Sequence, residues 1–397
     1  MFSLLRRPSR VLAVMLALLL VTLTACNSSS GGSSGKEDAL GPRIEGTSSA
    51  NGAPVLQNGD SWDELGAAST NEGTRVYAID REKAKEGISV GIQMVITSIP
   101  DSDDSGPGFE AQLTTPSGDT CATDSGGGGF SLSPRVFANA LVAVRGDADA
   151  ACVAADRLVL SITKTGSSKS TNQLRLRLSR LPESNPDDYE VPPSDEEATA
   201  PQLGAPTKAE PGTWLTDAQR IEPKKTMSGN IGSGETQTFK ISLDWGEGLS
   251  FQTSFPQPAP SERDKIKKAE LVPVINIIGA NGGTVRFTVY ASSTAANTRG
   301  ALAPLGYNSD DDLNTLKGDF TVVISALSKK KTDAKLAYQL VVDKTGSADS
   351  KFGPEIAETA SSSNTGDNRV WWSLLVIGAV LLVAGAGQVS LNRTHRR

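Results

Sequence analysis

Histidine is nearly absent from this chain of 397 residues: the single copy, His395, is third from the last residue. Without an imidazole in the body of the chain, no Ser-His-Asp or Cys-His nucleophile and no histidine-containing zinc site can form there. Only three cysteines are present, too few for a zinc site of four cysteines. We therefore expect no enzyme, no metal site and no cofactor, and the one catalytic alternative left is chemistry by a pair of carboxylates.

Aromatic and hydrophobic residues are also scarce, at 5% and 38% of the chain, while 39 Gly and 21 Pro are present. This composition is low for one large enzyme core and typical of small β domains joined by polar linkers. Setting aside the six arginines of the two chain ends leaves 33 basic residues against 45 acidic ones, a charge of about −12. Such an acidic body argues against nucleic acid, and against an anionic membrane surface as the main partner.

The first 25 residues have the pattern of a secretory signal of the lipoprotein type. Three arginines precede an uncharged apolar run at 11–23, which is short for a membrane-spanning helix. The run ends in "LTAC", which resembles the bacterial lipobox, in which the cysteine receives a diacylglyceryl group. We expect lipid on Cys26, which would anchor the chain through buried CH₂ groups; the alternative is cleavage before Cys26, leaving a thiol. Residues 26–44 read as a flexible linker.

The opposite end has the pattern of a transmembrane helix. Residues 370–389 are 20 uncharged, mostly apolar residues, long enough to cross a bilayer. Trp371 and Trp372 stand at one end, and the arginines of the tail, 390–397, follow the other, which places the tail in the cytoplasm. A buried core helix is the alternative. The body would then lie outside the cytoplasm, with membrane lipid as a partner and residues 346–369 as a juxtamembrane linker.

The body contains one pattern of segments twice. Each pair below shares apolar spacing and the turn residues that follow it. The matched segments are "EGTRVYAI" (72–79) with "GETQTFKI" (234–241), "EGISVGIQM" (86–94) with "EGLSFQTSF" (247–255), "FEAQLTTPSGD" (109–119) with "VINIIGANGG" (274–283), and the hairpins 157–181 with 319–343. The repeat predicts two domains, 45–182 and 212–345, joined by a semi-extended spacer rich in Pro and acid at 183–211.

Alternation of apolar and polar residues predicts β-strands covered on one face. Leu174, Leu176 and Leu178 share one face of the last strand in the first copy, and arginines occupy the other face. The corresponding inward residues of the second copy are Leu336, Tyr338, Leu340 and Val342. The fold class we expect is therefore mainly β, with two tandem, jelly-roll-like β-sandwich domains and one C-terminal transmembrane helix. The charged stretch 261–271 reads equally as a helix or an exposed loop.

Cys121 and Cys152 both lie in the first copy. Outside the cytoplasm, an even pair within one domain is most simply a disulfide, the alternative being two reduced, buried thiols. Two acidic stretches, "DSDDSG" (101–106) and "NSDDDLN" (308–314), lack the spacing of a calcium-binding EF-hand loop and read as solvated loops.

Three residues of the body are candidate contacts for a ligand or partner. Arg175 and Arg177 form a basic row that could grip an acidic wall polymer, although such a row is more often the wet face of a strand. Trp245, in "LDWGEGL", fits either a core position or a loop contact, and the sequence leaves both open. Lys329, Lys330 and Lys331 stand at a predicted hairpin tip, where charge solvates a turn.

The stretch "GSGETQTFKISLDWGEGLSF" (232–251) resembles the strand–strand unit of exported actinobacterial surface proteins with tandem modules similar to bacterial pre-peptidase C-terminal domains. The resemblance covers most of both copies in outline through short motifs. Such modules often accompany a von Willebrand factor A or protease domain, and neither is found here. The resemblance implies binding or spacer modules and transfers no catalytic residue.

Taken together, the sequence predicts a non-enzymatic, membrane-anchored, extracytoplasmic scaffold that presents two β-sandwich modules to an envelope protein. The alternatives are a protein that binds cell-wall polysaccharide and a carboxylate-based hydrolase.

Overall fold

The structure is a computed structural model and describes residues 40–81, 87–96, 107–127, 137–146, 148–166, 169–181, 184–193, 200–288, 295–308 and 316–355. Within these ranges no helix has the length and apolar character to span a membrane. The predicted signal sequence, Cys26, the transmembrane segment 370–389 and the cytoplasmic tail lie outside them. All described residues belong to one compact unit of the chain.

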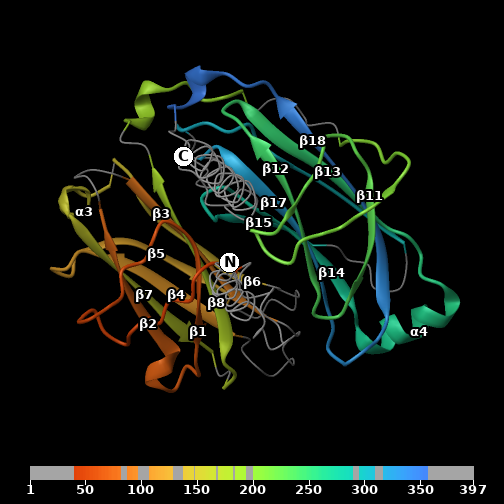
Figure 1. Ribbon diagram of the computed structural model, residues 1–397, viewed down its shortest axis with the longest axis horizontal. Helices are drawn as coiled ribbons and strands as arrows, with labels where there is room; N and C mark the ends of the chain where they lie inside the picture. Colours follow the sequence, from red (N-terminus) through yellow and green to blue (C-terminus); the bar gives the residue numbers. More distant parts are fainter. Residues whose placement is uncertain are drawn as a thin grey trace, which may run out of the picture. The chain divides into compact units, whose positions relative to one another are not determined.

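The first domain is a β-sandwich of two four-stranded sheets (Figure 1). One sheet has the strand order β1-β8-β3-β6 and the other β2-β7-β4-β5. Their bounds are β1 Gly59–Leu65, β2 Thr74–Asp80, β3 Gly87–Val95, β4 Gly108–Thr114, β5 Thr120–Gly126, β6 Phe137–Val144, β7 Arg157–Thr165 and β8 Asn172–Leu181, with the short helices η2 Asn71–Gly73 and α3 Ala150–Ala154.

The second domain is a sandwich of two five-stranded sheets, ordered β10-β12-β17-β14-β15 and β16-β13-β18-β11-β9. The strands are β9 Thr207–Lys208, β10 Gln219–Arg220, β11 Met227–Gly232, β12 Thr236–Leu243, β13 Glu247–Phe255, β14 Val272–Ile278, β15 Thr284–Thr288, β16 Ala296–Leu302, β17 Gly318–Leu327 and β18 Lys335–Gly346. The helical elements are η3 Pro186–Asp188 before the domain, α4 Pro260–Ala269 within it and η5 Ser350–Phe352 after it.

The internal repeat is confirmed at the level of strand order. If the edge strands β9 and β10 are left out, the two sheets of the second domain have the orders β11-β18-β13-β16 and β12-β17-β14-β15. Adding ten to each strand number in the sheets of the first domain gives the same two orders. The segment that enters each domain also forms the same antiparallel bridge to the corresponding strand. Thr47 bridges Val76 of β2, and Gly212 bridges Thr238 of β12. The prediction of tandem β-sandwiches is therefore confirmed.

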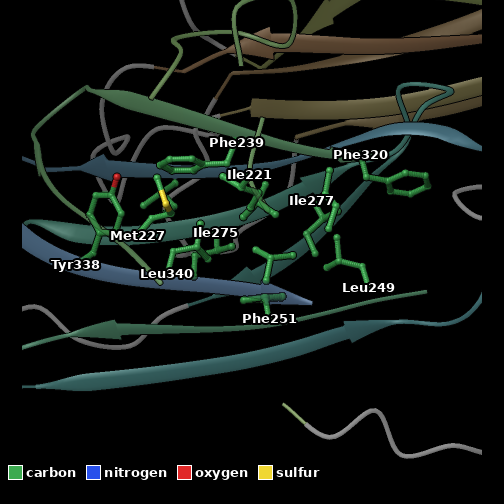
Figure 2. Close-up of a cluster of buried hydrophobic side chains, with 14 of the residues drawn as sticks. Ile221, Met227, Phe239, Leu249, Phe251, Ile275, Ile277, Phe320, Tyr338 and Leu340 are labelled. Carbon is green, nitrogen blue, oxygen red and sulfur yellow. The ribbon is translucent and has the colours of Figure 1, made fainter. Parts of the chain in front are cut away.

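Each sandwich encloses a hydrophobic core between its own two sheets. Leu174, Leu176 and Leu178 are buried in the first core, as the alternation predicts. In the second core, Figure 2 shows Phe239 and Phe320 from one sheet and Phe251 and Leu340 from the other, all lying between the two layers. The inward residues predicted for β18 are also confirmed, since all four are buried.

The ambiguous stretch 261–271 is mostly helix α4, which begins on a proline at its first turn and ends where Glu270 adopts a left-handed conformation with φ 52°. Proline is tolerated at a helix start because the missing N–H has no intrahelical partner there. Only Ile266 and Ala269 of the helix are buried, so one narrow stripe docks it on the sandwich while its charges face solvent.

The predicted spacer 183–211 is more ordered than its composition indicates. Strand β9 within it pairs in parallel with β11, and Ala209 is buried in the second core. Near its start, the Glu190 N–H donates to the Lys351 carbonyl at 3.0 Å. The described part of this segment is therefore packed against the second domain, because an open sheet edge offers unpaired backbone groups to an extended chain.

The disulfide between Cys121 and Cys152 is confirmed and joins β5 to helix α3. Next to it, the buried Arg81 donates hydrogen bonds from Nη1 to the carbonyl oxygens of Cys152, Val153 and Ala155. A guanidinium placed on the last carbonyls of a short helix satisfies acceptors that have no intrahelical donor.

Replacing both Cys121 and Cys152 by alanine should lower the free energy of unfolding by about 3–4 kcal/mol, because the bond closes a loop of 31 residues in the unfolded chain. Denaturant unfolding of the full-length protein in detergent measures this change. Reductant should shift the wild-type midpoint by a similar amount and leave the double variant unmoved. A double variant that still responds to reductant would contradict the assignment.

Candidate functional site

The arginine row of β8 lies on the outer face of its sheet, but solvent does not cover that face. Arg177 donates from Nε and Nη2 to the two carboxylate oxygens of Asp60 on β1, both at 2.7 Å. The side chains of this pair are only 16% and 10% exposed. The guanidinium carbon of Arg175 lies 4.0 Å from the centre of the Trp214 ring, a cation–π contact with the second domain.

The second domain covers this row with the outer face of its sheet β10-β12-β17-β14-β15. Residues from the two domains share a buried hydrophobic cluster, separate from both cores. Its buried members are Leu40, Trp214, Leu215, Val274, Ile278, Val323 and Leu327, and the partly buried Trp62 and Val95 of the first domain pack against it. The sheets thus meet face to face, and we call this contact the interdomain face.

A loop of the second domain sets Trp214 in place. The Asp217 carboxylate accepts hydrogen bonds from the Thr213 and Trp214 N–H groups at 2.9 and 2.6 Å, and the Thr238 hydroxyl donates to the Trp214 carbonyl. The indole is only 1% exposed. A turn closed by an aspartate side chain therefore holds the ring under Arg175.

Two glycines allow the closest approach of the sheets. A Cβ on Gly91 of β3 would stand 2.4 Å from the Cα of Gly282, so only glycine fits there. The neighbouring Gln93 donates from Nε2 to the Gly282 carbonyl at 2.9 Å. At the edge of the face, Arg145 donates from Nη2 to the Tyr307 carbonyl at 3.0 Å.

The pKa values of the two buried arginines shift in opposite directions. Burial lowers the pKa of Arg175 to about 10, because Asp217 and Asp60 compensate the lost hydration only in part. For Arg177, burial also opposes the charge, but the attraction and hydrogen bonds of Asp60 outweigh it and raise its pKa. The interpretation of Arg175 and Arg177 as ligand contacts on an exposed strand is therefore corrected: both bind groups within this chain.

Trp245 is a core residue, which decides between the two positions that the sequence left open. Its ring is 2% exposed and meets Tyr307 edge to face at 6.1 Å between centroids. The indole Nε1 donates to the Pro354 carbonyl at 2.8 Å, so it also fixes the segment that leaves the domain. Trp245 is therefore not a surface contact.

The other tryptophans of the body do not form an exposed platform. Trp214 lies in the interdomain face, and the half-buried Trp62 has the Arg43 guanidinium 5.1 Å above its ring. The one exposed large hydrophobic residue among the described ranges is Val191, at 63%.

The one buried carboxylate among the described residues, that of Asp63, binds groups within the protein. Asp63, 1% exposed, accepts hydrogen bonds from the Gly46 N–H and the Tyr77 hydroxyl, both at 2.8 Å, and Arg75 lies 3.4 Å away. Burial and the Asp63 charge raise the pKa of Tyr77, so this phenol stays protonated as a donor. Among the residues described, no group of three or more Cys, Asp or Glu side chains is arranged to hold a metal. Residues 101–106 and 309–314 of the acidic loops lie outside them.

Sequence reasoning missed Gly91, Gln93, Trp214 and Gly282 of the interdomain face, but one signal pointed to it. The stretches "VPVINII" (272–278) and "VVISAL" (322–327) are nearly continuous apolar runs, each interrupted by one polar residue, rather than alternating ones. Such runs are typical of strands covered on both faces. They are strands β14 and β17, which supply Val274, Ile278, Val323 and Leu327 to the shared cluster.

No protein-family model and no curated protein matches this sequence. Among solved structures, similarity was found to the N-terminal tandem of two carbohydrate-binding modules of Xyn10C from Paenibacillus barcinonensis (8% identity, 68% of this chain and 82% of that one, TM-score 0.19). Tandem carbohydrate-binding modules of a family 98 glycoside hydrolase from Streptococcus pneumoniae match with 10% identity, 69% and 81% coverage and a TM-score of 0.20. A structure of infectious bursal disease virus matches with 13% identity, 72% and 69% coverage and a TM-score of 0.20. Superpositions of this quality carry no argument about function.

Proposed function

We propose that this chain is a non-enzymatic scaffold of the cell envelope, held at the membrane outside the cytoplasm, that presents two β-sandwiches as one rigid unit to an envelope protein. The two chain ends support the membrane placement through their predicted lipid attachment at Cys26 and predicted span at 370–389. The Cys121–Cys152 disulfide supports an oxidising compartment.

The observation that carries the scaffold role is the interdomain face. Independent binding modules on a flexible linker keep their outer sheet faces solvated and move relative to each other. Here a cation–π contact, the hydrogen bond from Gln93 to Gly282 and two glycines in backbone contact join the faces, and the contact buries an ion pair of the first domain. A surface composed from both domains is then presented with fixed geometry, which lowers the entropic cost of binding a large partner.

Replacing Gly91 by valine should separate the two sandwiches, because the side chain would overlap the backbone at Gly282. Each sandwich keeps its own core, so both should stay folded. Affinity purification of the full-length protein from detergent-solubilised membranes should recover a defined protein with the wild type, and at least about tenfold less with the variant, equivalent to a loss of roughly 1.4 kcal/mol in binding.

The matched control is Gly146→Val, where an added Cβ meets nothing within 4 Å. It should recover the same partner as the wild type. Equal recovery with Gly91→Val, or no specific protein with any form, would overturn the scaffold role. Sedimentation with purified cell wall without any protein partner would favour the wall-polymer alternative. Reduced, full-length chain in the cytosolic fraction would overturn the membrane placement.

A further inference from the structure

Lysines gather at one end of the second sandwich, where helix α4 meets the turn between β17 and β18. The Lys329 and Lys330 N–H groups both donate to the Ala269 carbonyl, at 3.0 and 3.4 Å. These hydrogen bonds bring the end of α4 beside the hairpin turn. Seven exposed lysines belong to these two segments and the start of β18, namely Lys265, Lys267, Lys268, Lys329, Lys330, Lys331 and Lys335, and we call them the lysine end.

Acidic neighbours neutralise only part of this charge. Lys265 pairs with Glu262 and Asp333, Lys329 with Glu270, and Lys335 with Glu235. The other four, Lys267, Lys268, Lys330 and Lys331, have no ion-pair partner within the part of the chain that the structure describes. Asp264 of α4 is a further acidic neighbour, but positive charge still exceeds negative charge on this surface. Because the body as a whole carries about −12, this excess is a local reversal of sign rather than a general feature.

The lysine end is remote from the point where the chain leaves the domain. Strand β13 begins beside Trp245, which bonds to Pro354 of the departing segment, and ends just before α4. Its nine residues, at a rise of about 3.3 Å each, separate the two ends by roughly 30 Å. The lysine end and Pro354, next to the last described residue before the predicted membrane segment, therefore lie at opposite ends of the second sandwich.

We propose that the lysine end binds a linear polyanion of the cell wall, one whose repeat carries phosphodiester groups. Lysine presents a compact point charge on a flexible stem, which suits phosphate along a mobile chain and needs no fixed pocket. The separation from the point where the chain leaves the domain favours a polymer over the anionic surface of the membrane itself. This inference rests on the extracytoplasmic placement proposed above and assigns a second partner to the scaffold.

The test compares two quadruple variants of the full-length protein in detergent. The first replaces Lys267, Lys268, Lys330 and Lys331 by glutamine. The second is a matched control with the same change in net charge. It replaces by glutamine four lysines that are exposed elsewhere on the body, namely Lys169, Lys208, Lys224 and Lys225. Substitutions at exposed positions of this kind change stability by only about 0.5 kcal/mol, so both variants should fold.

Binding to polyphosphate and to purified cell wall is measured between low and high salt. The first variant should bind about tenfold or more weakly, with a reduced salt dependence because fewer counterions are released, while the control stays within about twofold of the wild type. Wall from which acid has removed the phosphodiester polymer should bind neither the wild type nor the control.

Equal weakening of both variants would overturn the proposal, since binding would then follow net charge alone. Binding to vesicles with anionic headgroups but not to the polymer would overturn it in favour of a lipid surface. Neither result would contradict the proposed scaffold role. That role is tested separately, by affinity purification of the protein partner and by cell fractionation.

Discussion

Replacing Asp60 by alanine is expected to destabilise the protein by about 3–5 kcal/mol, because it leaves the Arg177 guanidinium buried in the interdomain face without its counter-charge. Arg177 now donates two hydrogen bonds of 2.7 Å to that carboxylate. Thermal or denaturant unfolding of the full-length protein in detergent measures the change. The loss should also separate the two sandwiches, which small-angle scattering would detect as a larger radius of gyration.

The chain offers a matched control for this pair. Arg157 and Asp80 form a similar two-point ion pair across β7 and β2, but their side chains are 52% and 47% exposed. Removing an exposed partner typically costs under about 1 kcal/mol, so Asp80→Ala should have little effect. Replacing Asp60 by leucine together with Arg177 by methionine should recover most of the stability, because no unpaired charge remains. An equal loss of unfolding free energy in Asp60→Ala and Asp80→Ala would show that solvent reaches the interdomain face.

Replacing Trp245 by alanine is expected to cost about 3–5 kcal/mol, the usual range for deleting a large aromatic side chain from a core. The loss has two parts. The cavity removes the packing against Tyr307, and the Pro354 carbonyl loses the indole N–H that fixes the departing segment. Denaturant unfolding measures the first effect. Limited proteolysis near residues 347–355 measures the second, which should appear before global unfolding.

Val191→Ala is a suitable control for this experiment, because Val191 is exposed and its truncation should change stability by about 0.5 kcal/mol or less. If Trp245→Ala has an equally small effect and leaves the proteolysis pattern unchanged, the Trp245 side chain does not lie in the core.

The sequence predicted some of the residues that form the candidate site, but it did not predict that they bind groups of the same chain. Alternation on β8 identifies Arg175 and Arg177 as neighbours on the face opposite the leucines, and the structure confirms that placement. What lies over that face depends on Trp214 and Gly282, which are 37 or more residues away in the chain. Trp245 shows the same limit within one domain, since a lone tryptophan between two strands fits both a core and a loop position.

The sequence by itself determined the mainly β fold class and the tandem repeat. Period-two patterns predicted the inward faces of the last strands, the repeat predicted two similar domains, and the presence of just two cysteines in the body beyond Cys26 left one pairing for the disulfide. The chain ends stay predictions, since they lie outside the described residues. Only the tertiary structure decided that the two sandwiches share a buried face and that lysines from α4 and the β17–β18 turn meet on one surface. The physical reason is that local periodicity reports which way a side chain points, whereas the group that it meets is set by long-range packing.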